Sequence, residues 1–163
     1  MSSKEVEMYY KQAMSFLEQR KPKKALEFFD KSLEMDNQYL PAWNDKGVAL
    51  LELGEYRQAL SCFERVNILD PASNMPLYNK GYVLLLLEDY TESVKTFDLF
   101  LAKYPHKDDF YKFALYLKAK GHHGLKDYDE AHEILVEAVN MDKTFREARE
   151  LLILVLNEME EKN

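Results

Sequence analysis

Apolar positions recur at helical spacing along most of the chain, in pairs of short segments separated by brief polar breaks. The segment 40–71 shows this spacing most clearly, on both sides of a polar break at residues 55–57. Its apolar positions are Trp43, Gly47, Leu50 and Leu51, then Ala59, Leu60, Phe63 and Val66. Residues three or four positions apart share one face of an α-helix. The pattern therefore predicts two short amphipathic helices joined by a tight turn.

The same pair of helices is repeated along the chain. A small residue and, four positions later, a large apolar residue mark the second helix of each pair. These residues are Ala25 and Phe29, Ala59 and Phe63, Ser93 and Phe97, and Ala131 and Leu135. The small residues are 34, 34 and 38 residues apart, so the last step carries four extra residues. We place the extra residues around 104–111, where either the next helix begins one turn early or the connecting loop is longer.

Glycines and prolines fit this arrangement. Gly47 and Gly81 lie inside the predicted first helices, where glycine costs about 1 kcal/mol relative to alanine. We therefore expect a close approach of the second helix at both positions. Pro22 falls at the first position of a helix, and Pro71 and Pro105 follow helix ends, where proline blocks continuation.

The segment 40–71 also resembles the tetratricopeptide repeat pattern, because it carries W-x2-K-G-x2-L, then A-x3-F, then a closing proline. Lys46 and Leu50 depart from that pattern, which has leucine and tyrosine there. The resemblance covers roughly residues 6–145 and implies an all-α, right-handed α-solenoid of helix-turn-helix repeats. It predicts a single domain over 1–163, with repeats at approximately 6–39, 40–73, 74–107 and 108–145 and a C-terminal capping helix at 146–161.

The predicted last helix carries more apolar surface than one contact requires. One stripe has the spacing to cover the final repeat: Ala148, Leu151, Leu152, Val155 and Met159. Ile153, Leu154 and Leu156 lie on its other faces. This surplus favours self-association as an alternative function, with the last helix or the groove described below as the interface of a homodimer.

Charge and composition exclude several classes of partner. The chain has 22 Lys and Arg against 29 Asp and Glu, a net charge of −7, so we expect no nucleic-acid ligand. It contains one cysteine, Cys62, which suits a reducing compartment. We find neither an apolar leader at the N-terminus nor an apolar run long enough to cross a membrane. We therefore expect a cytoplasmic protein with no membrane partner.

The resemblance implies that the first helices of successive repeats line a concave groove and that a protein or peptide partner binds there. The predicted peptide-binding residues are Tyr10, Met14, Leu17, Asn44, Val48, Leu51, Met75, Tyr78, Tyr82, Leu85, Phe113, Tyr116 and Lys120. Tyrosine and methionine suit a surface that buries apolar groups. We therefore expect an apolar or amphipathic peptide segment as the ligand. The alternative is that these side chains pack between neighbouring repeats.

One subset of the family holds the acidic C-terminus of heat-shock chaperones with a clamp of lysine, asparagine and arginine residues. The matching positions here are Tyr10, Met14, Asp45, Met75 and Asn79, and none agrees with the clamp. Shifting the comparison by one repeat leaves only Asn79 in agreement. An acidic peptide would also meet a chain of net charge −7. We therefore exclude binding of chaperone tails.

No group of residues points to catalysis. His122 and His123 are adjacent, so their side chains leave a helix about 100° apart and make a poor metal site. Cys62 replaces an apolar core residue. No glycine-rich phosphate loop is present. We therefore expect no enzyme, metal or cofactor, and predict a non-catalytic protein–protein interaction module, an adaptor or scaffold.

Overall fold

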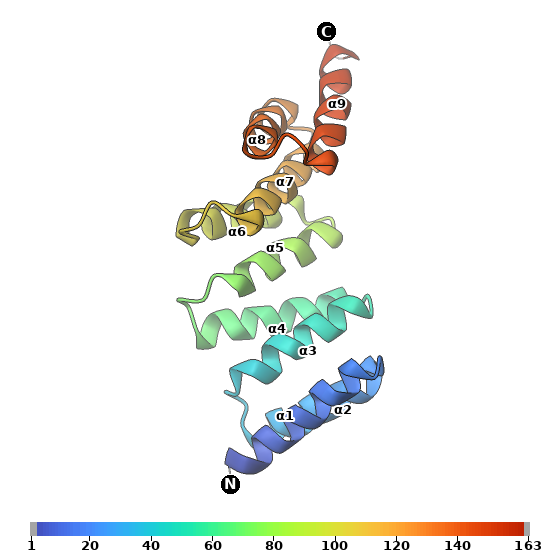
Figure 1. The fold of residues 1–163 in the computed structure, drawn as a ribbon, viewed down its shortest axis with the longest axis vertical. Coiled ribbons are helices and arrows are strands. Elements are labelled where there is room, and N and C mark those ends of the chain that lie inside the picture. Colours follow the sequence, from blue (N-terminus) through green and yellow to red (C-terminus); the bar gives the residue numbers. More distant parts are fainter. Residues whose placement is uncertain (1–2, 162–163) are drawn as a thin grey trace. The chain divides into compact units, whose positions relative to one another are not determined.

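The computed structural model describes residues 3–161, and within this range the chain forms nine α-helices and no strand. The helices are α1 (Ser3–Glu18), α2 (Pro22–Met35), α3 (Leu40–Glu52), α4 (Tyr56–Leu69), α5 (Met75–Leu86), α6 (Tyr90–Lys103), α7 (Asp109–Gly124), α8 (Tyr128–Met141) and α9 (Arg146–Glu161). Figure 1 shows them in chain order. The predicted all-α class is confirmed.

The chain divides into two compact units, Met1–Pro76 and Leu77–Asn163, with the boundary in the first turn of α5. In the first unit α1 packs on α2, α3 packs on α4, and α2 also contacts α3 (Figure 1). One core cluster of this unit consists of Ala13, Ala25, Phe29, Leu33, Ala42 and Ala49. Its small residues let the helices approach closely while Phe29 fills the space between them.

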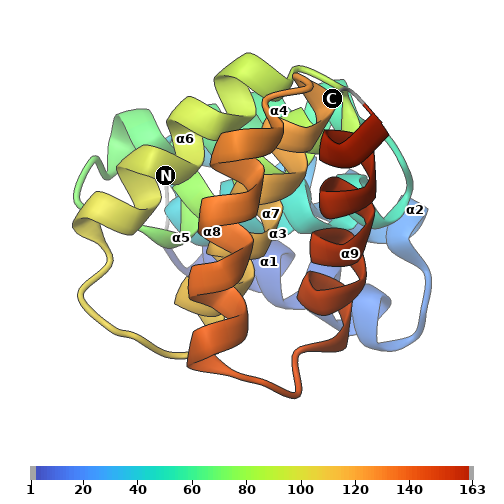
Figure 2. The same ribbon diagram turned by 90° about the horizontal axis from the view of Figure 1, so that it is seen from above.

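The second unit contains the rest of α5 and α6 to α9. Here α6 contacts α7, α7 contacts α8, and α9 packs against both α7 and α8. Figure 2 shows α8 and α9 side by side and joined at one end. The main core cluster is Leu115, Ala119, Ala131, Ile134, Leu135, Ala138, Phe145, Ala148 and Val155.

The repeated pair of small and large residues forms the centre of every helix pair. All eight of these side chains are 0 % exposed. A Cβ added at Gly47 would lie 2.8 Å from the Phe63 ring, and one at Gly81 would lie 3.0 Å from the Phe97 ring. The close approach predicted at both glycines is therefore confirmed. Ser93 replaces alanine in this series because its Oγ donates a hydrogen bond of 2.8 Å to the Gly81 carbonyl.

The four extra residues of the last repeat lengthen a helix and leave the loop unchanged. α7 has 16 residues, whereas α3 has 13 and α5 has 12. The segment before α7, residues 104–108, is as long as the segment 70–74 before α5. α7 also begins ten residues before its small residue Ala119, compared with seven before Gly47 in α3. The first alternative is confirmed: the helix begins about one turn early.

The turn inside each repeat contains one residue in the left-handed region of φ. These residues are Arg20 (φ 56°), Gly54 (78°), Glu88 (60°) and Lys126 (60°). Each donates its N–H to the carbonyl three residues earlier, as Arg20 does to Leu17 and Gly54 does to Leu51. Left-handed backbone costs roughly 1–2 kcal/mol for residues with a Cβ. Gly54 therefore adopts this conformation without strain, whereas the other three turns retain the backbone strain.

Arg20→Gly is expected to raise the free energy of unfolding of the first unit by up to about 1 kcal/mol, because relief of the left-handed strain outweighs the extra freedom of the unfolded chain. Gly54→Ala is the matched control in the same unit. Its added Cβ would meet no atom within 4 Å, so only the backbone term changes, and stability should fall by about 1 kcal/mol. The stability of both variants is measured by urea unfolding, with the fluorescence of Trp43, the single tryptophan, as the signal. Shifts of the same sign in the two variants would refute the strain argument.

Candidate functional site

In the first unit the predicted peptide-binding residues on α1 and α3 are all half-buried. They are Tyr10, Met14 and Leu17 on α1 and Asn44, Val48 and Leu51 on α3. The three residues of α1 pack against the core cluster of this unit. Much of their surface is therefore covered by their own chain.

Tyr10 connects the two first helices of this unit. Its hydroxyl donates a hydrogen bond of 2.6 Å to the Asp45 carboxylate, and its ring meets Tyr39 edge to face at 5.5 Å. Asn44 donates to the other oxygen of Asp45 at 3.0 Å. Burial, and then the hydrogen bond to Asp45, raises the pKa of Tyr10 well above its ordinary value. These contacts hold α1 against α3, which is the packing role that the sequence left open.

Tyr78, at the start of the second unit, is also held by its own chain. Its ring lies 6.0 Å from Phe97, 5.4 Å from Phe100 and 5.8 Å from Phe110, each time edge to face. Burial raises the pKa of its hydroxyl. Replacing Tyr78 would therefore disturb this aromatic cluster, so the residue is a poor probe of ligand binding. Met75 lies half-buried in the first turn of α5.

Three predicted residues of the second unit come together around a pocket of about 360 Å³. They are Tyr82 and Leu85 on α5 and Lys120 on α7. The remaining lining residues are Leu86, Glu88, Tyr90, His123, Gly124 and Leu151. Leu85 is 7 % exposed, whereas Tyr82 is 36 % exposed. We call this the α5–α7–α9 pocket.

The charged groups near this pocket have mixed signs. Lys120 is exposed, and its Nζ lies 5.7 Å from the centre of the Tyr116 ring. His123 Nε2 lies 2.7 Å from the Glu158 carboxylate, which ties α7 to α9. Burial, and then the charges of Glu147 and Glu150, raise the pKa of Tyr116. The pocket therefore combines apolar side chains and two tyrosines with the exposed cation of Lys120 in acidic surroundings.

Phe113 and Tyr116 lie together at another part of α7. Their rings are 4.8 Å and 5.4 Å from the ring of Phe145, which is 4 % exposed. Phe113 itself remains 38 % exposed. Tyr116 packs against the main core of this unit, so only Phe113 offers a broad apolar surface here.

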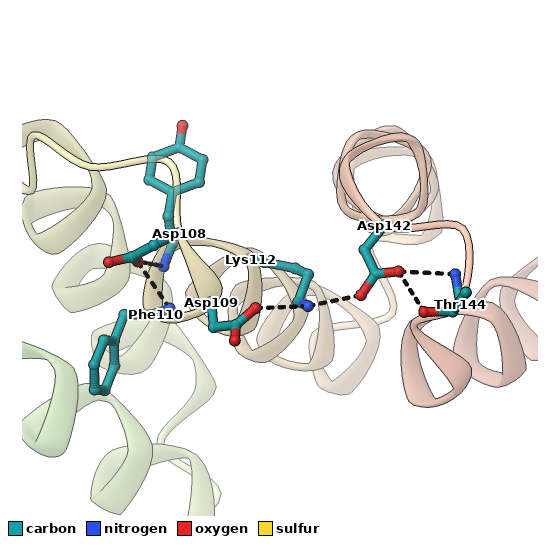
Figure 3. Close-up of polar contacts among 7 residues, drawn as sticks. Asp108, Asp109, Phe110, Lys112, Asp142 and Thr144 are labelled. Atoms are coloured by element: carbon teal, nitrogen blue, oxygen red, sulfur yellow. Dashed lines mark hydrogen bonds and ion pairs between the residues drawn. The ribbon is translucent and has the colours of Figure 1, made fainter.

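A lysine clasp fixes the beginning of α7 to the connection between α8 and α9. The Nζ of Lys112, whose side chain is 13 % exposed, lies 2.9 Å from Asp109 and 2.7 Å from Asp142 (Figure 3). Asp142 also accepts from the N–H and hydroxyl of Thr144, at 2.9 Å and 2.6 Å. The hydrogen bonds from Lys112 and then Thr144 lower the pKa of Asp142 to about 2. Because α9 begins at Arg146, the clasp helps to position the helix that lines the pocket.

Sequence reasoning missed the part of the pocket that comes from outside the first helices. Leu151 belongs to the predicted capping stripe, and it both packs against the main core cluster and lines the pocket. Gly124 carried the available signal, because a glycine within a helix is unfavourable and therefore indicates a packing reason such as close approach. A Cβ at Gly124 would lie 2.7 Å from three atoms of the Tyr90 ring, so this ring lies against the α7 backbone.

The described residues give little support for other chemistry. Within residues 3–161, no three or more His, Cys, Asp and Glu side chains gather in a way that could hold a metal ion. No helix in that range is long and apolar enough to cross a membrane. Burial raises the pKa of the Cys62 thiol to about 11, so this cysteine is a poor nucleophile.

Two family models, both for the tetratricopeptide repeat, match residues 16–80 and 77–106. The uncharacterised protein MJ0572 of Methanocaldococcus jannaschii is 40 % identical over 62 residues, which are 38 % of this chain and 72 % of that protein.

The solved structure of MamA from Desulfovibrio magneticus RS-1 has a TM-score of 0.89 at 22 % identity, over 98 % of this chain and 88 % of that one. The first TPR of Spaghetti (RPAP3), bound to the HSP90 peptide SRMEEVD, has a TM-score of 0.68 at 18 % identity, over 76 % and 95 %. Together with the helices described above, these likenesses establish an all-α helical repeat of the solenoid class.

Proposed function

Because the chain belongs to the tetratricopeptide repeat family, we propose that it is an adaptor or scaffold that binds an apolar or amphipathic peptide segment. Proteins of this family are generally non-catalytic modules that bind protein or peptide partners. The observation that supports a peptide site is the α5–α7–α9 pocket, where Tyr82 stays exposed beside the apolar side chains of Leu85 and Leu151. We place the binding site there.

The chemistry of the pocket suits an apolar anchor from a partner. A rigid tyrosine ring beside leucines buries an apolar side chain at a low entropic cost. Leu85, Leu86 and Leu151 supply the apolar contacts, and Lys120 can donate a hydrogen bond to a carboxylate or carbonyl oxygen of the ligand. An amphipathic helix would present such an anchor from one face. The net charge of −7 favours a neutral or basic segment over an acidic one.

The pocket differs in kind from a clamp for acidic peptides. The first TPR of Spaghetti was solved with the acidic peptide SRMEEVD, whereas this chain has Tyr10 and Met14 at two clamp positions, and both pack against its own core. SRMEEVD therefore serves as the negative control peptide, and we expect it not to bind.

An array of synthetic amphipathic peptides, with leucine or phenylalanine at i, i+3, i+4 and i+7 spacing, tests the proposal. The wild-type protein should select a subset of these peptides, and Tyr82→Ala combined with Lys120→Ala should weaken their binding at least about tenfold. Leu99→Ala is the control, because Leu99 is 53 % exposed on α6 and lies outside the pocket. Equal binding by the wild type and the double variant would contradict this site, and so would selection of SRMEEVD.

Self-association is the second candidate function, and the surface of α9 favours it. Ile153 is 59 % exposed, Leu154 45 % and Leu156 40 %. Three exposed apolar side chains within four residues are more than a solvated helix requires. The single, buried cysteine suits a reducing compartment, and we propose the cytoplasm as the place of action.

A further inference from the structure

The exposed side of α9 carries a stripe of four residues with a basic end, an apolar middle and an acidic end. The outer stripe is Arg149, Ile153, Leu156 and Glu160. Successive members are four, three and four positions apart, the spacing that keeps residues on one face of a helix. The opposite face is buried, because Ala148 and Val155 are 0 % exposed in the core of the second unit.

The outer stripe is available for contact. Ile153 and Leu156 are among the exposed large apolar residues, and Arg149 and Glu160 are exposed as well. Within residues 3–161 neither Arg149 nor Glu160 has an ion pair or a side-chain hydrogen bond. Arg146 is already paired with Glu150, at 2.7 Å. Leu154 is two positions from Leu156, about 200° around the helix, and so lies outside the stripe.

We infer that α9 packs antiparallel against α9 of a second copy of this chain; this inference rests on self-association as a function. With the two helices antiparallel, Ile153 of each copy faces Leu156 of the other. The same register places Arg149 of each copy opposite Glu160 of the other. Two apolar layers then lie between two opposite-charge pairs, and every member of the outer stripe has a complementary partner.

The order of charges along the stripe selects this arrangement. A parallel pair would place arginine against arginine and glutamate against glutamate, which is unfavourable. A partner of uniform charge would match only one end of the stripe. Leu152 and Met159, half-buried beside the stripe, widen the apolar contact. One helix pair buries less surface than a stable interface of about 1,200–2,000 Å², so the dimer belongs to the weak, concentration-dependent class.

Sedimentation equilibrium from low to high micromolar protein concentration tests the inference. The wild type should pass from monomer to dimer within this range. Arg149→Glu creates two Glu–Glu contacts in the antiparallel dimer, and Glu160→Arg creates two Arg–Arg contacts. Each variant should raise the dissociation constant of the dimer at least about tenfold. An equimolar mixture of the two variants should dimerise like the wild type, because both cross-copy pairs again have opposite charges.

The outcomes separate this arrangement from self-association in general. Far-UV circular dichroism checks that the variants keep their helical content, which is expected because both positions are exposed. Leu99→Ser changes an apolar residue of α6 that is about as exposed as Ile153 and Leu156, and it should leave the dissociation constant of the dimer unchanged. A wild type that stays monomeric throughout overturns self-association and this inference together. A wild-type dimer that neither charge variant weakens overturns the α9 arrangement alone and leaves self-association through another surface.

Discussion

Val155→Asp is expected to unfold most of the second unit. Val155 is 0 % exposed and belongs to the core cluster in which α9 meets α7 and α8. A buried polar group without a partner costs roughly 2–7 kcal/mol, and an ionised carboxylate costs more. Whole domains are stable by only about 5–15 kcal/mol. A loss of helical circular dichroism and a large fall in the urea midpoint should follow.

The control for this prediction lies two residues away on the same helix. Ile153→Asp places the same carboxylate at a position that is 59 % exposed, so monomer stability should change by less than about 0.5 kcal/mol. Both variants are measured at low protein concentration, so that self-association does not contribute. Equal stability of the two variants would show that α9 does not cap the last repeat, and with it the proposed role of this helix would fall.

Phe97→Ala is expected to lower the free energy of unfolding by about 3–5 kcal/mol. Phe97 is 0 % exposed, packs against the Gly81 backbone and lies 6.0 Å from the Tyr78 ring. Truncation leaves a cavity that the facing glycine cannot fill, because Gly81 has no side chain to move into it. Urea unfolding followed by far-UV circular dichroism measures the loss.

Leu99→Ala on the same helix provides the comparison for Phe97. Leu99 is 53 % exposed, so its truncation should change stability by no more than about 0.5 kcal/mol. Nearly equal losses at the two positions would mean that the repeated aromatic column does not form the centre of each helix pair.

The fold could be predicted from the sequence because the same pattern of small and large residues occurs in every repeat. Each small residue of the series faces a large apolar residue, so the same packing solution recurs with the same period. The left-handed turns at Arg20, Glu88 and Lys126 could not be read in this way. The two helices of each repeat pack against each other, and this packing determines the conformation of the turn between them. It therefore overrides the preference of these residues for other backbone angles.

The candidate site was less predictable. Spacing alone does not show which residues of an inward-facing stripe already contact other residues of the same chain. Tyr10 and Tyr78 have the same residue type and the same slot as candidates for ligand binding. The structure shows that Asp45 and Tyr39 engage the first, and that three phenylalanine rings surround the second. These contacts depend on loop and neighbouring-helix residues that no periodic pattern connects. Lys112 and Asp142 illustrate the same limit, since 30 positions separate the two partners.

The proposal of a peptide site at the α5–α7–α9 pocket is tested most directly by nuclear magnetic resonance. Protein labelled with ¹⁵N and ¹³C-methyl groups is titrated with a peptide selected from the amphipathic array. The account predicts that the largest shift changes fall on Tyr82, Leu85, Lys120 and Leu151, and that Leu99 on α6 stays unchanged. Shift changes centred on another surface, with the four pocket residues unaffected, would contradict it.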